Sequence, residues 1–208
     1  MELNNKKFSR RNFCLCCLGS AAAAASSGWL SPRQAYAEAR GIVSLIKDSA
    51  ATSPITTYKL RHNISVLEGS GGNIAVLTGS DGKVLIDAGI RVSRPQLTKA
   101  LADIGADPVT HLVNTHWHFD HADGNEWLHS EGARIIAQEN TRKHLAGIQR
   151  VEDWDYNFLP LGPGGIPSEV FSDAHGVKLN GASIALKHYG RAHTDSDRTW
   201  TWLPASLT

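Results

Sequence analysis

Three short stretches near the start of the folded region are dominated by apolar positions and bounded by polar ones. Residues 58–67, 73–78 and 84–87 are rich in aliphatic and β-branched residues, which favours strands. They are separated by residues 69–72 (Gly-Ser-Gly-Gly) and 80–82 (Ser-Asp-Gly), both typical of tight turns. Consecutive strands joined by such short turns run in opposite directions, so this region is predicted to form an antiparallel meander.

The pattern then changes to the period of a helix. Leu97, Leu101 and Ile104 recur at helical spacing and define one apolar face. We expect Ser93 to cap this helix and Gly105 to end it.

Predicted strands and helices alternate in the rest of the chain. The expected elements are strands at 111–114, 133–137, 177–179 and 182–188 and helices at 125–129 and 141–148. This order predicts a sheet covered by helices. Residues 151–167 are rich in Pro, Gly and aromatic residues and are expected to form a long loop, a feature that is uncommon unless it covers a site.

Length and composition indicate one folded domain. The chain has 208 residues, of which 41% are hydrophobic and 20% charged. Residues 1–37 carry five basic and one acidic side chain, so residues 38–208 carry 16 basic and 19 acidic ones, a net charge of −3. A mildly acidic domain lacks the surplus of Lys and Arg that releases counterions from nucleic acid, so no nucleic-acid partner is expected.

The first 37 residues have the order of a secretory signal peptide. Arg10-Arg11 is followed by the uncharged residues 14–30 and by the small-x-small sequence Ala35-Tyr36-Ala37. The paired arginines resemble a twin-arginine signal, so we expect the twin-arginine export machinery as a partner and a periplasmic or secreted domain of residues 38–208. An uncleaved membrane anchor is the alternative. Ser and Gly residues lower the hydrophobicity of the uncharged segment, so no stable membrane anchoring is expected.

All the cysteines lie in this leader. Cys14, Cys16 and Cys17 are the three in the sequence, which excludes disulfides, cysteine nucleophiles and thiolate metal ligands from residues 38–208. Export in the folded state suits a protein whose metal or other cofactor is loaded before transport.

The densest group of potential metal ligands directly follows the predicted strand at 111–114. His116, His118, Asp120 and His121 lie within six residues. Because residues i and i+2 of an extended segment point the same way, His116 and His118 can bind one ion. A turn beyond them can direct a carboxylate and a third imidazole to a neighbouring ion, and zinc accepts both kinds of donor. The alternative is a chance cluster on a solvated loop.

His-x-His-x-Asp-His at the end of a strand resembles the signature of the metallo-β-lactamase superfamily. The resemblance covers residues 58–197 and includes residues 84–89 (Val-Leu-Ile-Asp-Ala-Gly) before the signature and 190–195 (Gly-Arg-Ala-His-Thr-Asp) after it. It implies a mixed fold of helices and sheets, α/β (α+β) in class. The expected architecture is a four-layer αββα sandwich with a two-metal site at one edge of its sheets.

The resemblance also implies a role for each site residue. The implied ligands are His116, His118 and His193 for the first metal and Asp120 and His121 for the second. Asp87 matches an acidic position beneath the metals, where it would accept an imidazole N–H and fix the orientation of a ligand.

The implied chemistry is hydrolysis of a small-molecule substrate. Two zinc ions ~3.5–4 Å apart share one water, lower its pKa toward ~7 and so hold a hydroxide as nucleophile. Asp120 would orient this hydroxide while the first metal polarises the carbonyl of an ester-like or amide-like bond, as in a β-lactam or lactone. Two alternatives stay open: an iron-dependent oxygenase of the same fold that acts on a persulfide, and a non-catalytic metal-binding protein.

The remaining aromatic and acidic candidates receive structural interpretations. Histidines without ligand spacing are expected on the surface or in the core: His62, His111, His129, His144, His175 and His188. Trp117 and Phe119 are expected to pack beside the ligand loop. The aromatic residues of the long loop are candidates for an apolar substrate wall: Trp154, Tyr156 and Phe158. Asp195 and Asp197 are expected to brace the loop around His193.

The end of the sequence gives rise to a separate expectation. Residues 198–208 contain no Asp, Glu, Cys or His, whereas the family supplies a bridging acidic ligand and a final histidine after the Gly-x-x-His motif. Residues 199–203 have the alternation of one more strand. The interpretation favoured here is a truncated or frame-shifted chain with an incomplete C-terminal half, which would hold one tightly bound metal and have reduced activity.

Overall fold

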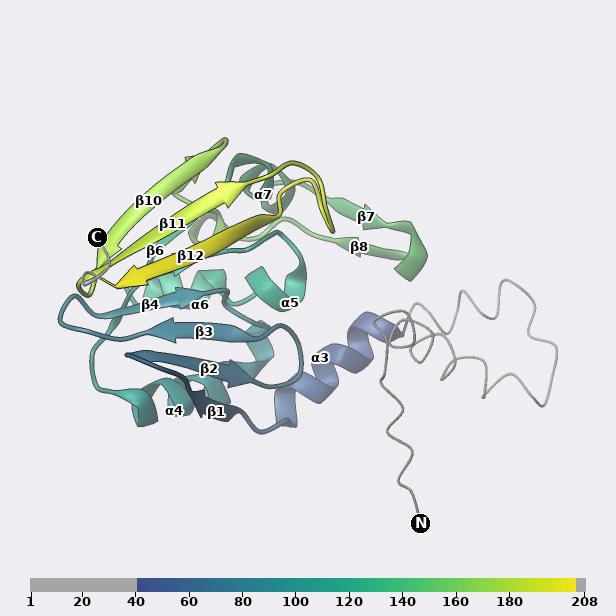
Figure 1. Ribbon diagram of the computed structural model, residues 1–208. Helices are drawn as coiled ribbons and strands as arrows, with labels where there is room; N and C mark the ends of the chain where they lie inside the picture. The colour runs from purple at the N-terminus through teal and green to yellow at the C-terminus, as the bar shows by residue number, and fades with distance from the viewer. Residues whose placement is uncertain (1–40, 205–208) are drawn as a thin grey trace, which may run out of the picture.

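The computed structural model describes residues 41–204, and the leader expected at residues 1–37 lies outside them (Figure 1). The larger sheet has seven strands, in the order β1 (Thr56–Lys59), β2 (Ile64–Glu68), β3 (Ile74–Leu77), β4 (Lys83–Ile86), β5 (Val109–Val113), β6 (Arg134–Gln138) and β9 (Glu169–Phe171). The smaller sheet has three, β10 (Ala174–Leu179), β11 (Ala182–His188) and β12 (Arg198–Pro204). A separate hairpin joins β7 (Gln149–Val151) and β8 (Tyr156–Phe158).

Helices lie between and beside these strands. They are α3 (Ile42–Thr52), α4 (Arg94–Ile104), α5 (Phe119–Ala122), α6 (Asn125–Ser130) and α7 (Glu139–Leu145), with 3₁₀ turns η2 (Arg91–Ser93), η3 (Glu152–Trp154) and η4 (Pro163–Gly165). None of the helices in the described part of the chain is both long and apolar enough to cross a membrane.

The antiparallel meander is confirmed, since β1, β2, β3 and β4 pair in sequence order with opposite directions. The single predicted strand at 58–67 is wrong in extent. The chain leaves the sheet after Lys59 and turns through His62, whose φ of 59° is incompatible with a strand, before β2 begins at Ile64. From β4 onward the sheet is parallel through β5, β6 and β9, so the carboxyl ends of these strands meet at one edge.

Alternation along the central strands creates two apolar cores. Leu85 of β4 belongs to the core beneath the helices, with Leu97 and Leu128 among its members. Val84 and Ile86 belong to the second core, between the two sheets, with Ile184 of β11. This is the period of two expected of a strand buried on both faces.

The helix predicted from Leu97, Leu101 and Ile104 is α4, and Gly105 follows its last residue. Ser93 precedes the helix but does not cap it with its side chain. Its hydroxyl instead donates a hydrogen bond to the carbonyl of Ala50 at 3.1 Å, which ties α3 to the start of α4.

The long loop expected at 151–167 contains more structure than its composition predicted. Residues 149–158 form the β7–β8 hairpin, and a 3₁₀ turn follows at 163–165. Trp154, Tyr156 and Phe158 pack against the small core formed by α3 and Phe119. This segment is ordered because its aromatic side chains pack on a helix. The local content of Pro and Gly, on which the loop prediction was based, gives no information about such a contact.

The expected sandwich of sheets and helices is confirmed, with helices on one face of the larger sheet and the smaller sheet on the other (Figure 1). The strand interpretation of residues 199–203 is correct, because they lie within β12. Side chains on the outer face of the smaller sheet are exposed, including Lys178, Ala185 and Thr201. No helix within residues 41–204 covers this face.

A turn-to-turn contact joins the two sheets at the edge opposite residues 115–124, the ligand loop, which carries four of the predicted metal ligands. Asn180, between β10 and β11, has a φ of 54°, a left-handed conformation that Asn tolerates. Its backbone N–H donates to the Asp81 carboxylate at 2.7 Å, and its side-chain oxygen accepts from the Asp81 N–H at 2.9 Å. Its amide nitrogen also donates to the Gly82 carbonyl at 2.8 Å.

We expect Asn180→Ala to lower the free energy of unfolding by about 1–3 kcal/mol, because it removes two hydrogen bonds and places Ala in a left-handed conformation. Urea unfolding followed by circular dichroism measures the change. Asn157→Ala, at an exposed position of β8, is the matched control and should alter stability by less than about 0.5 kcal/mol. Equal stability of the two variants would contradict a role for Asn180 in joining the sheets.

Candidate metal centre

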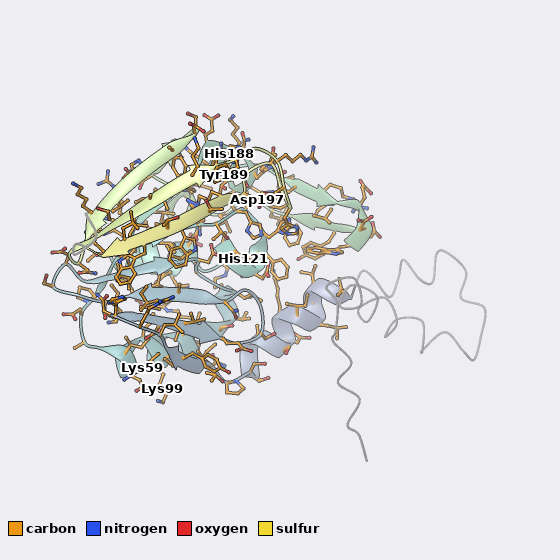
Figure 2. All side chains as sticks on the ribbon, viewed as in Figure 1. Lys59, Lys99, His121, His188, Tyr189 and Asp197 are labelled. Carbon is orange, nitrogen blue, oxygen red and sulfur yellow. The ribbon has the colours of Figure 1, made fainter. Side chains whose placement is uncertain are left out.

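The predicted ligands gather where the parallel strands β4 and β5 end. Asp87 directly follows β4, and His116 lies three residues after the last residue of β5. His193 comes from the connection between β11 and β12 in the smaller sheet. Figure 2 shows His121 at this edge, beside the end of the smaller sheet that carries His188 and Asp197.

The structure brings His116, His118 and His193 together. One ring nitrogen from each lies within 4.8 Å of those of the other two. Nε2 of His193 is 3.0 Å from Nδ1 of His118, and the ring of His116 is 4.7 Å from that of His118 and 5.2 Å from that of His193. Residues 77 positions apart in the sequence thus form one cluster of imidazoles, the only group of three or more potential ligands found within residues 41–204.

A metal ion suits this cluster because one of its nitrogens is buried without a partner. His116 is 7% exposed, and its Nε2 has no hydrogen-bond partner in the described part of the chain. A buried polar atom of this kind is costly unless another group satisfies it. Three imidazoles are a common donor set for zinc, so the residues present fit the ion that the sequence implied.

Burial and neighbouring imidazoles keep the first two ligands neutral. Burial, with the charges of His121 and His118 adding to it, lowers the pKa of His116 to about 3. Burial and the neighbouring His193 lower the pKa of His118 to about 4. Both imidazoles therefore have free lone pairs at neutral pH, which is the state that binds a metal.

Asp120 and His121 form a second group beside the first. His121 Nε2 is 3.4 Å from the Asp120 carboxylate, and the His121 ring lies 4.2 Å from the ring of His116. Burial lowers the pKa of His121, but its hydrogen bond to Asp87 and the charges of Asp87 and Asp120 outweigh this effect and raise it. The resemblance assigns these two side chains to a second metal, and their role as ligands stays a prediction.

Asp87 lies beneath the ligand loop. Its side chain is nearly inaccessible, and its backbone has a φ of 70°, a strained conformation for a residue other than Gly. It accepts hydrogen bonds from the Thr115 N–H at 2.6 Å, the Thr115 hydroxyl at 2.7 Å and His121 Nδ1 at 2.7 Å. The last contact fixes the orientation of the His121 ring, with Nε2 directed away from Asp87.

Two buried asparagines close the ligand loop, and the sequence analysis missed them. Asn114 precedes the loop and Asn125 follows it, and each side-chain amide donates to the oxygen of the other at 2.8 Å. Asn125 also donates to the Gly165 carbonyl at 2.9 Å. Nothing in the local pattern pairs these residues.

The glycine-rich turn between β2 and β3 approaches the same loop. A Cβ atom on Gly72 would lie 2.5 Å from the His121 ring, so only Gly fits there. The Gly72 N–H donates to the Asp120 carbonyl at 3.3 Å. The sequence Gly-Ser-Gly-Gly was interpreted only as a turn, although consecutive glycines also signal a close approach of the backbone to another group.

The loop that carries His193 is braced on two sides, as expected for Asp195 and Asp197. The Asp197 carboxylate accepts from the Thr194 N–H at 2.5 Å and from the Thr194 hydroxyl at 2.9 Å. Asp195 contacts His144 of α7, whose Nε2 lies 2.7 Å from the carboxylate. Asn140 of the same helix donates to the Asp195 carbonyl at 3.0 Å.

Aromatic side chains surround the imidazoles. Trp117 packs on His118 at 4.5 Å between ring centres and on His144 at 5.1 Å, and Trp154 lies 6.0 Å from His118. Phe119 is buried, which agrees with the expected packing role. Of the three candidates for a substrate wall, Trp154 is the one with a ring contact to a predicted ligand.

Comparisons with known proteins agree with this geometry. Residues 67–197, more than half of the chain, match the family described as the metallo-beta-lactamase superfamily. Hydroxyacylglutathione hydrolase of Erythrobacter litoralis (strain HTCC2594) is 50% identical over 44 residues, which are 21% of this chain and 17% of that protein. The protein of the same name from Maricaulis maris (strain MCS10) is 43% identical over 56 residues, which are 26% of this chain and 22% of that protein.

Solved structures of metallo-β-lactamases share the fold. One from Cronobacter sakazakii has a TM-score of 0.66 and 23% identity, over 78% of this chain and 62% of that one. A subclass B3 enzyme of Bradyrhizobium japonicum has a TM-score of 0.63 and 21% identity, over 74% and 59% of the two chains. The chain thus spans less than two thirds of the length of these structures. Because the family match covers more than half of the chain and the site geometry agrees with it, this chain belongs to the metallo-β-lactamase superfamily.

Proposed function

We propose that this protein is a metal-dependent hydrolase that cleaves an ester-like or amide-like bond in a small molecule. The observation that carries the proposal is the cluster of His116, His118 and His193, in which a buried imidazole nitrogen has no partner within the described residues. Two neutral imidazoles and the adjacent Asp120 carboxylate provide both a metal site and a group that can accept a proton.

The residues of the chain divide the work of hydrolysis. Zinc held by the three histidines would lower the pKa of a bound water toward ~7 and polarise the substrate carbonyl. The Asp120 carboxylate, partly exposed beside His121, accepts a hydrogen bond from the attacking water and orients it. Trp154, near His118, offers an apolar surface against which a substrate can pack.

The substrate class is supported by the relatives and by the leader. The structural neighbours include subclass B3 metallo-β-lactamases, and the short curated matches are hydroxyacylglutathione hydrolases. The twin-arginine-type sequence of residues 1–37 supports a place of action outside the cytoplasm, which favours a β-lactam, a lactone or a related ester.

The activity is tested with the purified, zinc-loaded protein on a panel of a chromogenic β-lactam, a lactone, a hydroxyacylglutathione thioester and a phosphodiester. We expect hydrolysis of at least one member, and we expect His116→Ala to reduce the rate to that of the metal-free protein. His129→Ala, on α6 and bonded to the Ala133 carbonyl, is the matched control and should retain activity. No hydrolysis above the His116→Ala background would contradict the proposal, as would bound iron accompanied by oxygen uptake.

We also expect one tightly bound metal per chain. The three-histidine cluster supplies three protein ligands to one ion, whereas only two side chains, Asp120 and His121, are predicted for the second position. Elemental analysis after dialysis against a weak chelator measures the ratio. Two retained zinc ions per monodisperse chain would show the expectation to be wrong.

His144 is expected to act as a positioning residue for His193. Because it holds Asp195 from α7, His144→Ala should free the loop and weaken zinc binding about tenfold, as loss of a supporting contact does at other zinc sites. Competition with a chromogenic chelator measures the affinity without reference to activity. If His144→Ala and the control His129→Ala bind zinc equally well, the brace has no effect on the metal site.

A further inference from the structure

A cavity lies behind the ligand loop, residues 115–124. It has a volume of about 510 Å³, within the range of small-molecule sites. Its walls come from α3, the start of α5, the β7–β8 hairpin and residues 159–162.

This cavity is separate from the candidate metal centre. None of the five predicted metal ligands lines it, whereas Trp117 and Phe119, which alternate with His118 and Asp120 along the chain, do. The Trp117 ring packs against His118, so it stands between the two sites. A molecule in the cavity would therefore touch the back of the ligand loop, and the hydrolytic mechanism does not use this space.

Four aromatic rings give the cavity an apolar wall. Phe119 and Phe158 are stacked with ring centres 5.3 Å apart, and Tyr156 lies 4.6 Å from Phe158. Trp117 approaches Phe158 edge-on at 6.3 Å. A wall of this kind favours a ligand with an aromatic or branched apolar body.

Lys47 supplies a positive charge that no acidic side chain within residues 41–204 neutralises by an ion pair. Its ammonium lies 5.6 Å from the centre of the Phe119 ring and 6.0 Å from that of Tyr156. Arg91, the other cation of the cavity, differs, because it lies 3.8 Å from Asp123 and 3.7 Å from Glu126. A ligand that displaces water from the Lys47 ammonium removes the hydration of a charged group. An anionic group on the ligand compensates for this loss by a charge-assisted hydrogen bond.

We propose that this cavity binds a small organic anion, a carboxylate with an aromatic or branched apolar body, whose charged group contacts Lys47. The apolar body lies against Trp117, Tyr156 and Phe158. This site is independent of the proposed hydrolysis, because its lining contains none of the predicted metal ligands.

The test is calorimetric titration of the full chain with 4-phenylbutyrate, with and without zinc. We expect saturable binding of one molecule per chain in both forms, and binding about tenfold weaker in Lys47→Met, which keeps the length of the side chain and removes its charge. Lys47→Arg should retain binding. Lys99→Met is the matched control and should bind as the unchanged protein does, because Lys99 pairs with Asp103 on α4, does not line the cavity and lies at the lower edge of the view, away from His121 (Figure 2).

A second comparison uses the unchanged protein and does not depend on the folding of a variant. The neutral amide 4-phenylbutyramide has the same apolar body and should bind at least about tenfold more weakly than the carboxylate. Equal binding of amide and carboxylate, equal binding by Lys47→Met, or no saturable binding would overturn the proposal. Binding that requires zinc and disappears in His116→Ala would place the anion at the metal centre and would also overturn it.

Discussion

The geometry of the site depends on the need to satisfy one buried carboxylate. Asp87 is 2% exposed, and an unpaired charge at that position would be costly. The three hydrogen bonds that it accepts all come from the ligand loop, two from Thr115 and one from His121. The end of β4 therefore dictates how the chain leaves β5. The amide pair of Asn114 and Asn125 then joins the two ends of the loop, which Asp87 holds at Thr115 and at His121.

The same arrangement shifts the pKa values of the site histidines in opposite directions. His116 is buried and His118 is half-buried, and both lie among other imidazoles, so they resist protonation, with pKa values of about 3 and about 4. His121 faces the carboxylates of Asp87 and Asp120, and its pKa is raised despite its burial. Protons and metal ions compete for the same nitrogens. At neutral pH the imidazoles of His116 and His118 are thus unprotonated, which is the state that binds a metal.

The local sequence pattern was sufficient to predict those parts of the fold and site that depend on residues close together in the sequence. The meander and α4 follow from residue periods, and the grouping of His116, His118, Asp120 and His121 follows from their spacing. The structure differs from those expectations where a contact between residues distant in sequence determines the local conformation. Residues 149–158 form a hairpin because their aromatic side chains pack on α3, and Ser93 bonds to Ala50 instead of capping α4. His144 had no ligand spacing, and its function as a brace appears only when α7 meets Asp195.

Alternation of side chains gives the ligand loop two different faces. His116 and His118 project into the imidazole cluster, while the residues between and after them, Trp117 and Phe119, line the aromatic cavity. The rings of Trp117 and Phe119 both contact Phe158 behind this cluster, and these contacts support the loop. Because Trp117 contacts both His118 and His144, the cavity wall is also part of the support for the His193 loop. The size and chemistry of the cavity are therefore constrained by the metal centre. The Lys47 ammonium, which has no ion-pair partner within residues 41–204, is the feature that this structural role leaves unexplained.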